Sequence, residues 1–248
     1  RRIVDIISDV NLCYSEHARR YLMECGLPKE RTFVTGSPMA EVLHANLDKI
    51  EASDVHQRLG LTKGQYILLS AHREENIDTD RNFVQLFTAV NAMAEKYDMP
   101  ILYSCHPRSR KRLEATGFQL DTRVIAHEPL GFLDYNCLQM NAFAVVSDSG
   151  TLPEESSFFL SVGKPFPAVS IRTSTERPEA LDAGCFVLAG IDADSLLQAV
   201  EMAVGMQRAE CFGTPVAGYT AENVSMKVAR IIQSYTGIVN KMVWRKNG

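Results

Sequence analysis

The residues best suited to chemistry lie in the segment 147–155, SDSGTLPEE, which directly follows an apolar run. Such a run predicts a buried parallel strand. Pro153 predicts a helix start, because the amide hydrogen that proline lacks would have no partner there, and we expect Ser149 or Thr151 to cap that helix. A strand that turns into a helix presents main-chain amides and the positive end of the helix dipole at one point. That point suits a diphosphate, and Glu155, one turn further on, suits the hydroxyls of a ribose.

Polar and charged residues also follow three other apolar runs. They are His72-Arg73-Glu74 after 66–70, His106-Pro107-Arg108 after 100–104, and the segment 172–177, with Arg172, Glu176 and Arg177, after 166–171. Ligands of parallel sheets bind at the carboxyl ends of the strands, near the point where the strand order reverses. Arginine and histidine supply positive charge there, and the amides after Ser149 form an anion nest. The pattern predicts a site for a nucleotide or a nucleotide sugar.

The elements that must position these residues alternate between strand and helix. The expected strands are 11–14, 31–34, 66–70, 100–104, 123–126, 142–147, 166–171 and 185–189. The expected helices are 1–9, 16–25, 39–60 with an interruption near Ser53, 79–97, 108–114, 131–141, one from Pro153, 193–206 and 221–239. This alternation predicts an α/β fold with a doubly wound, mostly parallel sheet.

Several classes of function and site are disfavoured by the sequence. No GxGxxG motif follows a strand and no GxxxxGK[ST] motif is present, and the cysteines and histidines lack the spacing of metal ligands. We therefore expect no metal and no cofactor. A net charge of −4 provides no general attraction to nucleic acid or to an anionic membrane. Six scattered cysteines are typical of reduced thiols, so we expect a cytoplasmic protein without a membrane span or signal peptide.

Some of these residues also have purely structural interpretations. His72 could be a capping or packing histidine, although its place beside Arg73 favours a functional role. For His106, a scaffolding His-Pro turn is about as plausible as a functional role. Phe132 and Tyr135 lie three apart on one helix face, and either could belong to the core or to a base pocket; we favour the core for Phe132.

Four segments together resemble the non-hydrolysing UDP-N-acetylglucosamine 2-epimerase family. They are TGSPMAEVL at 35–43, HREEN at 72–76, SDSGTLPEE at 147–155 and GKPFPAVSIRTSTERPEALDAG at 163–184. The wider family usually has a second glycine and then Ile-Gln where this sequence has Thr151-Leu152-Pro153. That difference is more similar to the branch that forms UDP-N-acetyl-L-fucosamine for surface polysaccharides such as capsule and O-antigen.

The resemblance implies a two-domain, GT-B type arrangement of Rossmann-like domains that bind the nucleotide between them. It implies that residues 1–36 are the tail of the first domain, 37–220 the UDP-binding domain and 221–248 a crossover helix and tail. It also implies a UDP-sugar substrate and a homodimer. The carboxylates usually credited with proton transfer at C2 are expected upstream of Arg1, so this chain by itself is expected to be inactive.

By the same resemblance, Ser149, Gly150 and Thr151 would hold phosphate, Glu155 the ribose and Tyr135 the uracil, and the catalytic residues would be His72, Glu176 and Arg177. The positive charge at the strand ends adds Arg73, His106 and Arg172 to the expected UDP-binding residues. The implied reaction inverts C2 of a UDP-2-acetamido sugar by eliminating UDP and adding it back. Two alternatives remain open: the donor-binding half of a glycosyltransferase with the same layout, and a non-catalytic fragment that binds UDP-sugars.

Overall fold

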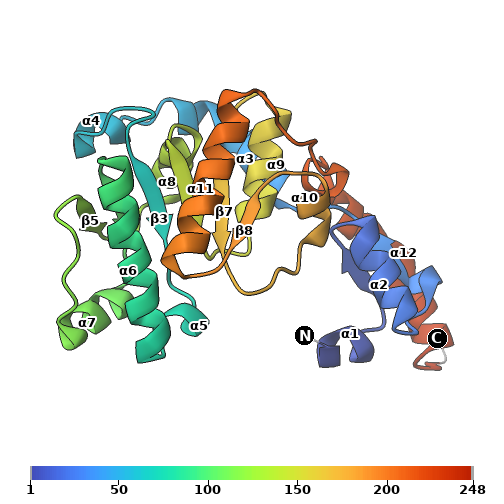
Figure 1. Cartoon of the computed structure of the whole chain (residues 1–248). Helices are drawn as coiled ribbons and strands as arrows, with labels where there is room; N and C mark the ends of the chain where they lie inside the picture. The colour runs from blue at the N-terminus through green and yellow to red at the C-terminus, as the bar shows by residue number, and fades with distance from the viewer. Residues whose placement is uncertain (1, 247–248) are drawn as a thin grey trace. The chain divides into compact units, whose positions relative to one another are not determined.

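A computed structural model describes residues 2–246 of the chain (Figure 1). The chain divides into two compact units, one formed by Asn46–Thr214 and the other by Arg1–Ala45 together with Pro215–Gly248. The helix α3 (Met39–Glu51) contains one boundary between them. Residues 1 and 247–248, at the outer ends of the first and last predicted segments, lie outside the described residues.

The larger unit is built on a six-stranded sheet in which all the paired strands are parallel. The strands are β3 (Ile67–Ser70), β4 (Ile101–Ser104), β5 (Val124–His127), β6 (Ala144–Ser147), β7 (Ala168–Ile171) and β8 (Val187–Ala189). Their order across the sheet is β5-β4-β3-β6-β7-β8. From β3 the chain adds strands toward one edge, up to β5, and from β6 it adds them toward the other edge. This arrangement confirms the predicted doubly wound sheet and puts its switch point where β3 and β6 lie side by side.

Helices cover both faces of this sheet. They are α4 (Val55–Leu59), α5 (Glu74–Ile77), α6 (Asp80–Tyr97), α7 (Pro107–Thr116), α8 (Phe132–Met140), α9 (Leu152–Ser161), α10 (Pro178–Asp182) and α11 (Ala193–Arg208). Helices α6 and α11 lie side by side on one face (Figure 1). One cluster of buried side chains lies between the sheet and the helices α6 and α11. No side chain of α8 or α9 belongs to it, so α8 and α9 lie on the opposite face of the sheet.

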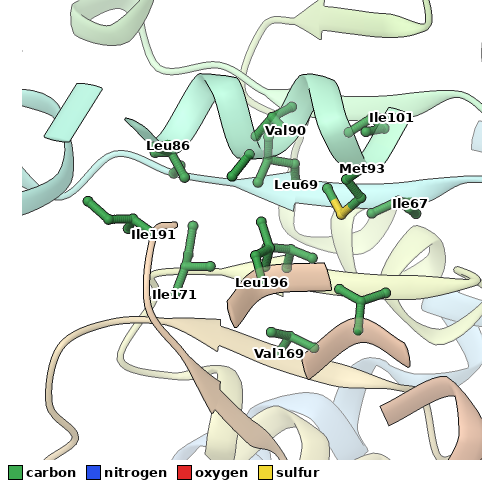
Figure 2. Close-up of a cluster of buried hydrophobic side chains, with 14 of the residues drawn as sticks. Ile67, Leu69, Leu86, Val90, Met93, Ile101, Val169, Ile171, Ile191 and Leu196 are labelled. Atoms are coloured by element: carbon green, nitrogen blue, oxygen red, sulfur yellow. The ribbon is translucent and has the colours of Figure 1, made fainter. Parts of the chain in front are cut away.

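The core under α6 and α11 follows from two periodicities. Alternate strand residues such as Ile67 and Leu69 point to one face of the sheet, and Leu86, Val90 and Met93 recur on one side of α6. All five side chains are fully buried and meet in one cluster (Figure 2). The inner strands are covered on both faces and are apolar at nearly every position, which explains why continuous apolar runs predicted them. The edge strand β5 leaves Ile125 exposed.

The smaller unit contains a two-stranded parallel sheet and three helices that lie entirely within it. These are β1 (Asn11–Cys13), β2 (Thr32–Val34), α1 (Arg2–Ile7), α2 (Glu16–Glu24) and α12 (Val224–Met242), with short 3-10 turns at Lys29–Arg31 and Ala217–Tyr219. The hydroxyl of Ser15 accepts a hydrogen bond from the Ala18 amide at 3.2 Å, which confirms the predicted cap of α2. Gly26, with φ of +87°, follows the end of that helix.

Gly36 and Gly26 offer a matched test of backbone strain against close packing. Both have positive φ, but a Cβ at Gly36 would lie 2.4 Å from Cβ of Ala221, whereas a Cβ at Gly26 would meet nothing within 4 Å. We expect Gly26→Ala to lower the free energy of unfolding by about 1 kcal/mol, the cost of a left-handed residue. Gly36→Ala should cost about 1–3 kcal/mol more, because overpacking adds to that strain. Urea unfolding of both variants measures the difference, and equal losses would contradict the close approach at Gly36.

Two interpretations of the helices were wrong. Phe132 was assigned to the core but is 42% exposed, because the first turn of α8 carries it to the surface. Neither Ser149 nor Thr151 caps α9 in the expected way. Thr151 occupies the N-cap position without a side-chain capping bond, and the Ser149 hydroxyl accepts a hydrogen bond from the Thr151 amide instead, at 3.3 Å.

Candidate functional site

The buried carboxylate of Asp148 joins the ends of β3 and β6 at the switch point. Its Oδ2 accepts hydrogen bonds from the amides of His72 at 2.9 Å and Arg73 at 2.8 Å, and from Nδ2 of Asn76 at 3.1 Å. Its Oδ1 lies 3.3 Å from Nδ1 of His72. Asp148 is fully buried and His72 is half exposed. The turn that carries His72 is thus held by a residue 76 positions later in the chain.

Arg73 brings a guanidinium to the loop that follows β6. Its Nε donates to the carbonyl oxygen of Asp148 at 2.7 Å, and a Cβ built at Gly150 would lie 3.2 Å from one of its terminal nitrogens. Glycine at position 150 therefore lets the cation lie against the main chain. The result is positive charge beside the main chain at Gly150, two residues before α9, which favours an anion at that point.

Hydroxyl groups organise the start of α9 itself. The Ser149 amide donates to Oγ of Ser147 at 3.0 Å, and the Thr151 hydroxyl donates to Oε1 of Glu155 at 2.7 Å. Since that bond uses the Thr151 proton, the Ser149 hydroxyl is the donor in its 2.9 Å contact with Thr151. Among the described residues the Gly150 amide has no hydrogen-bond partner, which leaves it available to a ligand.

Glu155 is held in place from two sides. Besides the Thr151 hydroxyl, Nε2 of Gln139 donates to its Oε2 at 2.7 Å. Burial raises the pKa of the Glu155 carboxyl, the two hydrogen bonds lower it in part, and the neighbouring Glu154 adds to the rise. Gln139 is fully buried, and its Oε1 has no hydrogen-bond partner among the described residues. A buried polar atom without a hydrogen bond costs free energy, so a ligand that donates to Oε1 of Gln139 would be favoured here.

Tyr135 places a phenol beside the same carboxylate. Burial raises the pKa of its hydroxyl, and the charge of Glu155 raises it further; hydrogen bonds with Ser147 and Ser70 act in the opposite direction. These four residues come from α8, α9 and the ends of β3 and β6. Tyr135 therefore stands as a neutral phenol at the switch point, where its ring can pack against a planar ligand.

A hollow of about 300 Å³ collects most of the predicted residues. Its lining residues are Ser70, His72, Ser104, His106, Pro129, Tyr135, Ser149, Thr151 and Glu155. They come from the ends of four neighbouring strands, β5, β4, β3 and β6, or the segments that follow them, and from α8 and α9. Six residues predicted for the site thus share one hollow at the carboxyl edge of the sheet.

The remaining predicted residues do not line this hollow. Arg172 is buried and donates to both carboxylate oxygens of Glu176, at 3.0 and 3.2 Å, with Glu75 3.7 Å away. Arg177 forms an ion pair with the buried Glu154 on α9, at 2.9 Å. The guanidinium groups of Arg172 and Arg177 are therefore both engaged in ion pairs with carboxylates of the protein. Arg73 and Gly150 are not lining residues, although each is next in the chain to a residue that is.

Two residues of the site were not singled out from the sequence. Asp148 was visible only as part of the SDSG segment, and Gln139 resembled any polar residue of an exposed helix. The signal for Asp148 was its place directly after an apolar run, next to the predicted anion nest. Nothing in the local sequence marked Gln139, because its burial depends on the packing of α8 against α9.

Within residues 2–246 the structure contains no group of three or more histidine, cysteine or acidic residues arranged to hold a metal ion. Nor does that part of the chain include a helix with the length and apolar character that crossing a membrane requires.

Comparisons with known proteins agree on one family. The family model described as UDP-N-acetylglucosamine 2-epimerase matches residues 1–233. A UDP-N-acetylglucosamine 2-epimerase of Methanococcus maripaludis is 32% identical over 208 residues, which are 81% of this chain and 56% of that protein. The chain thus spans little more than half the length of this curated relative.

Solved structures agree with this result. The structure of a UDP-N-acetylglucosamine 2-epimerase from Rickettsia bellii matches 99% of this chain and 65% of its own, with 40% identity and a TM-score of 0.89. A Methanocaldococcus jannaschii UDP-GlcNAc 2-epimerase in complex with UDP-GlcNAc and UDP matches 94% of this chain and 63% of its own, with 27% identity and a TM-score of 0.82.

Proposed function

This chain belongs to the UDP-N-acetylglucosamine 2-epimerase family, and from that premise we propose that it is the UDP-binding part of a UDP-sugar 2-epimerase. The observation that carries the proposal is the shared hollow, where His72, His106, Tyr135 and Glu155 meet the start of α9. Its position at the switch point is where sheets of this order bind nucleotides. Ser149, Gly150 and Thr151 would hold phosphate, with the Gly150 amide, which has no partner among the described residues, as the first donor and Arg73 adding positive charge beside Gly150.

The nucleoside end of the ligand would lie against α8 and α9. The carboxylate of Glu155 retains acceptor sites beyond its bonds to Gln139 and Thr151, because a carboxylate has about four, and these suit the two ribose hydroxyls. The ring of Tyr135 would pack against uracil. The proposed UDP-binding domain spans 37–220, with 1–36 as the tail of the first domain and 221–248 as a crossover helix and tail. The larger compact unit lies within that range.

The reaction proposed for the whole protein inverts C2 of a UDP-2-acetamido sugar. The C2 proton is removed as UDP departs, and UDP then adds back to the resulting glycal with the proton on the other face. Donors aimed at the departing diphosphate stabilise its growing charge, and proton transfer at C2 needs acid–base groups. In this scheme His72 would act at the diphosphate. Glu176 pairs with Arg172, and Arg177 pairs with Glu154 of α9. In this scheme Glu176 and Arg177 would act on the sugar from the loop that these two ion pairs hold beside α9.

We also propose a product for the reaction and a biosynthetic role for the protein. The Thr151-Leu152-Pro153 variant of the motif supports a UDP-N-acetyl-L-fucosamine-forming enzyme for surface polysaccharide, and the UDP-GlcNAc/UDP-ManNAc interconversion is the alternative substrate pair. We further propose that the protein is a cytoplasmic homodimer.

Deuterium incorporation tests the proposed reaction. The whole protein is incubated in D₂O with UDP-GlcNAc, and separately with a 6-deoxy-talose-type UDP-2-acetamido sugar, and the recovered sugar is analysed by mass spectrometry and NMR. We expect deuterium at C2, and faster incorporation into the 6-deoxy substrate supports the finer proposal. Absence of exchange with both sugars, or transfer of the sugar to an acceptor without exchange, contradicts the epimerase assignment.

A further inference from the structure

We propose that Asp148 is a positioning residue that fixes the tautomer of His72, so that Nδ1 carries the ring proton and Nε2 is the nitrogen presented to the hollow. This assignment concerns the protonation of the side chain and holds whatever ligand the hollow binds. Only its consequence for turnover rests on the proposed function.

The two oxygens of Asp148 have different surroundings. Oδ2 accepts three hydrogen bonds, from two main-chain amides and from Nδ2 of Asn76. Oδ1 is buried and has no hydrogen bond among the described residues. Its one ionic contact there is Nδ1 of His72, at 3.3 Å. The contact is not aligned as a hydrogen bond, but the negative charge of the carboxylate at this distance favours a proton rather than a lone pair on the nearest ring nitrogen.

The chemistry of the two groups decides which nitrogen is protonated. An ionised carboxylate only accepts hydrogen bonds, and a neutral imidazole has one N–H and one lone pair. With Nδ1 at 3.3 Å from Oδ1, the electrostatically favourable arrangement puts the proton on Nδ1. His72 is half exposed and lines the hollow, so Nε2 is the nitrogen left for a ligand, and in the neutral ring it carries the lone pair.

His106, the other histidine of the hollow, has the opposite arrangement. It is the N-cap of α7, and its Nδ1 accepts the hydrogen bond of the Arg108 amide at 3.3 Å. Because Nδ1 is an acceptor there, neutral His106 carries its proton on Nε2. The hollow therefore presents one histidine whose Nε2 accepts a proton and one whose Nε2 donates. Without these neighbouring groups, neither ring would have a fixed tautomer.

The variant Asp148→Asn reverses only the first of these assignments. Three N–H donors hold whichever oxygen occupies the Oδ2 position, so the amide oxygen of asparagine must take that place. The NH₂ group then occupies the Oδ1 position, and its positive hydrogens next to Nδ1 of His72 favour a lone pair there and the ring proton on Nε2. The three bonds that hold the His72 turn are kept, and His106 is untouched.

Long-range ¹H–¹⁵N NMR spectra of the histidine-labelled full chain read the tautomers directly. His72→Gln and His106→Gln variants assign the two rings. We expect the Nδ1–H pattern for His72 in the wild type, the Nε2–H pattern for His72 in Asp148→Asn, and the Nε2–H pattern for His106 in both. The wild-type spectrum decides the matter even if the variant fails to fold: an Nε2–H pattern or an even mixture at His72 overturns the proposal. In a folded variant, an unchanged His72 pattern also overturns it.

The consequence for turnover is measured by C2 exchange in the whole protein. In this scheme protonated His72 gives its Nε2 proton to a diphosphate oxygen, so that an N–H bond breaks and an O–H bond forms, and takes it back when UDP adds again. Asp148→Asn should lower kcat by about 100-fold or more, the usual range for an acid–base group, with KM changed little. Combined with His72→Gln, it should cost nothing further; additive losses overturn the positioning role. If the wild type shows no exchange, the proposed function fails while the NMR assignment stands.

Discussion

Replacing Glu155 by glutamine is expected to stabilise the folded protein at neutral pH and to weaken its binding of UDP. The carboxyl is buried, and burial raises its pKa because the ionised form loses its hydration. Glutamine has the same shape but carries no charge. Its amide oxygen can accept from Nε2 of Gln139, and its NH₂ group can donate to the hydroxyl oxygen of Thr151. The folded variant therefore avoids the desolvation cost of a buried carboxylate, while the proposed ribose site loses its charged acceptor.

The sign of the pH dependence follows from the direction of that shift. The folded protein holds the Glu155 proton more tightly than the unfolded chain does, so its advantage is complete below the ordinary carboxyl pKa of 4.5. As pH rises from there through the raised pKa, the wild type loses stability relative to Glu155→Gln. Urea unfolding from pH 4.5 to pH 8 should show a gap between the two proteins that widens and then levels off.

Calorimetry with UDP measures the second half of this expectation. Hydrogen bonds to charged groups contribute about 1.5–3 kcal/mol, so we expect affinity for UDP to fall about 10- to 100-fold. The control is Glu95→Gln, which removes an exposed carboxylate from α6 and should change neither quantity. A Glu155→Gln protein that is less stable at pH 8 but binds UDP normally would show that this carboxylate is structural.

Replacing Phe87 by alanine should cause the largest loss of stability among single changes in the larger unit. Phe87 is fully buried, with its ring centroid 4.7 Å from that of Phe83 and 5.5 Å from that of Tyr103. Removing the ring forfeits its burial and leaves a cavity between α6 and the sheet. Such changes cost about 3–5 kcal/mol.

Phe132→Ala is the matched control for this prediction, because the same side chain is 42% exposed there; its effect should stay within about 0.5 kcal/mol. Far-UV circular dichroism is the suitable probe, since the single tryptophan, Trp244, belongs to the other unit. A loss below about 1 kcal/mol for Phe87→Ala would contradict the tightly packed core described above.

The elements of the fold could be predicted because their signals are local. An apolar run such as 142–147 is a strand wherever its neighbours lie, and the structure has β6 at Ala144–Ser147. Ser15 caps α2 through an amide three residues away. The parallel sheet followed from the alternation of strands and helices, because parallel neighbours require long crossovers. The start of α9 shows the limit of such reasoning, since its hydroxyls bond to Glu155 and to each other.

The candidate site was predictable only in part, for a related reason. His72 and His106 were found because each follows a strand closely, and Glu155 because it lies in the first turns of the helix after β6; these strands end at one edge of the sheet. Gln139 was missed because its partner is on another helix. The ion pair of Arg177 with Glu154 likewise spans 23 residues, and no local pattern shows which carboxylate an arginine meets.

The strands, the helices and the polar residues at their ends could be predicted, because apolar periodicity and end residues act over a few positions. Which strand ends lie together depends on contacts between distant segments. The pairing of β3 with β6 buries Asp148 beneath His72, across 76 residues. A contact at that separation depends on the order in which strands pair, and strand order is a property of the whole sheet.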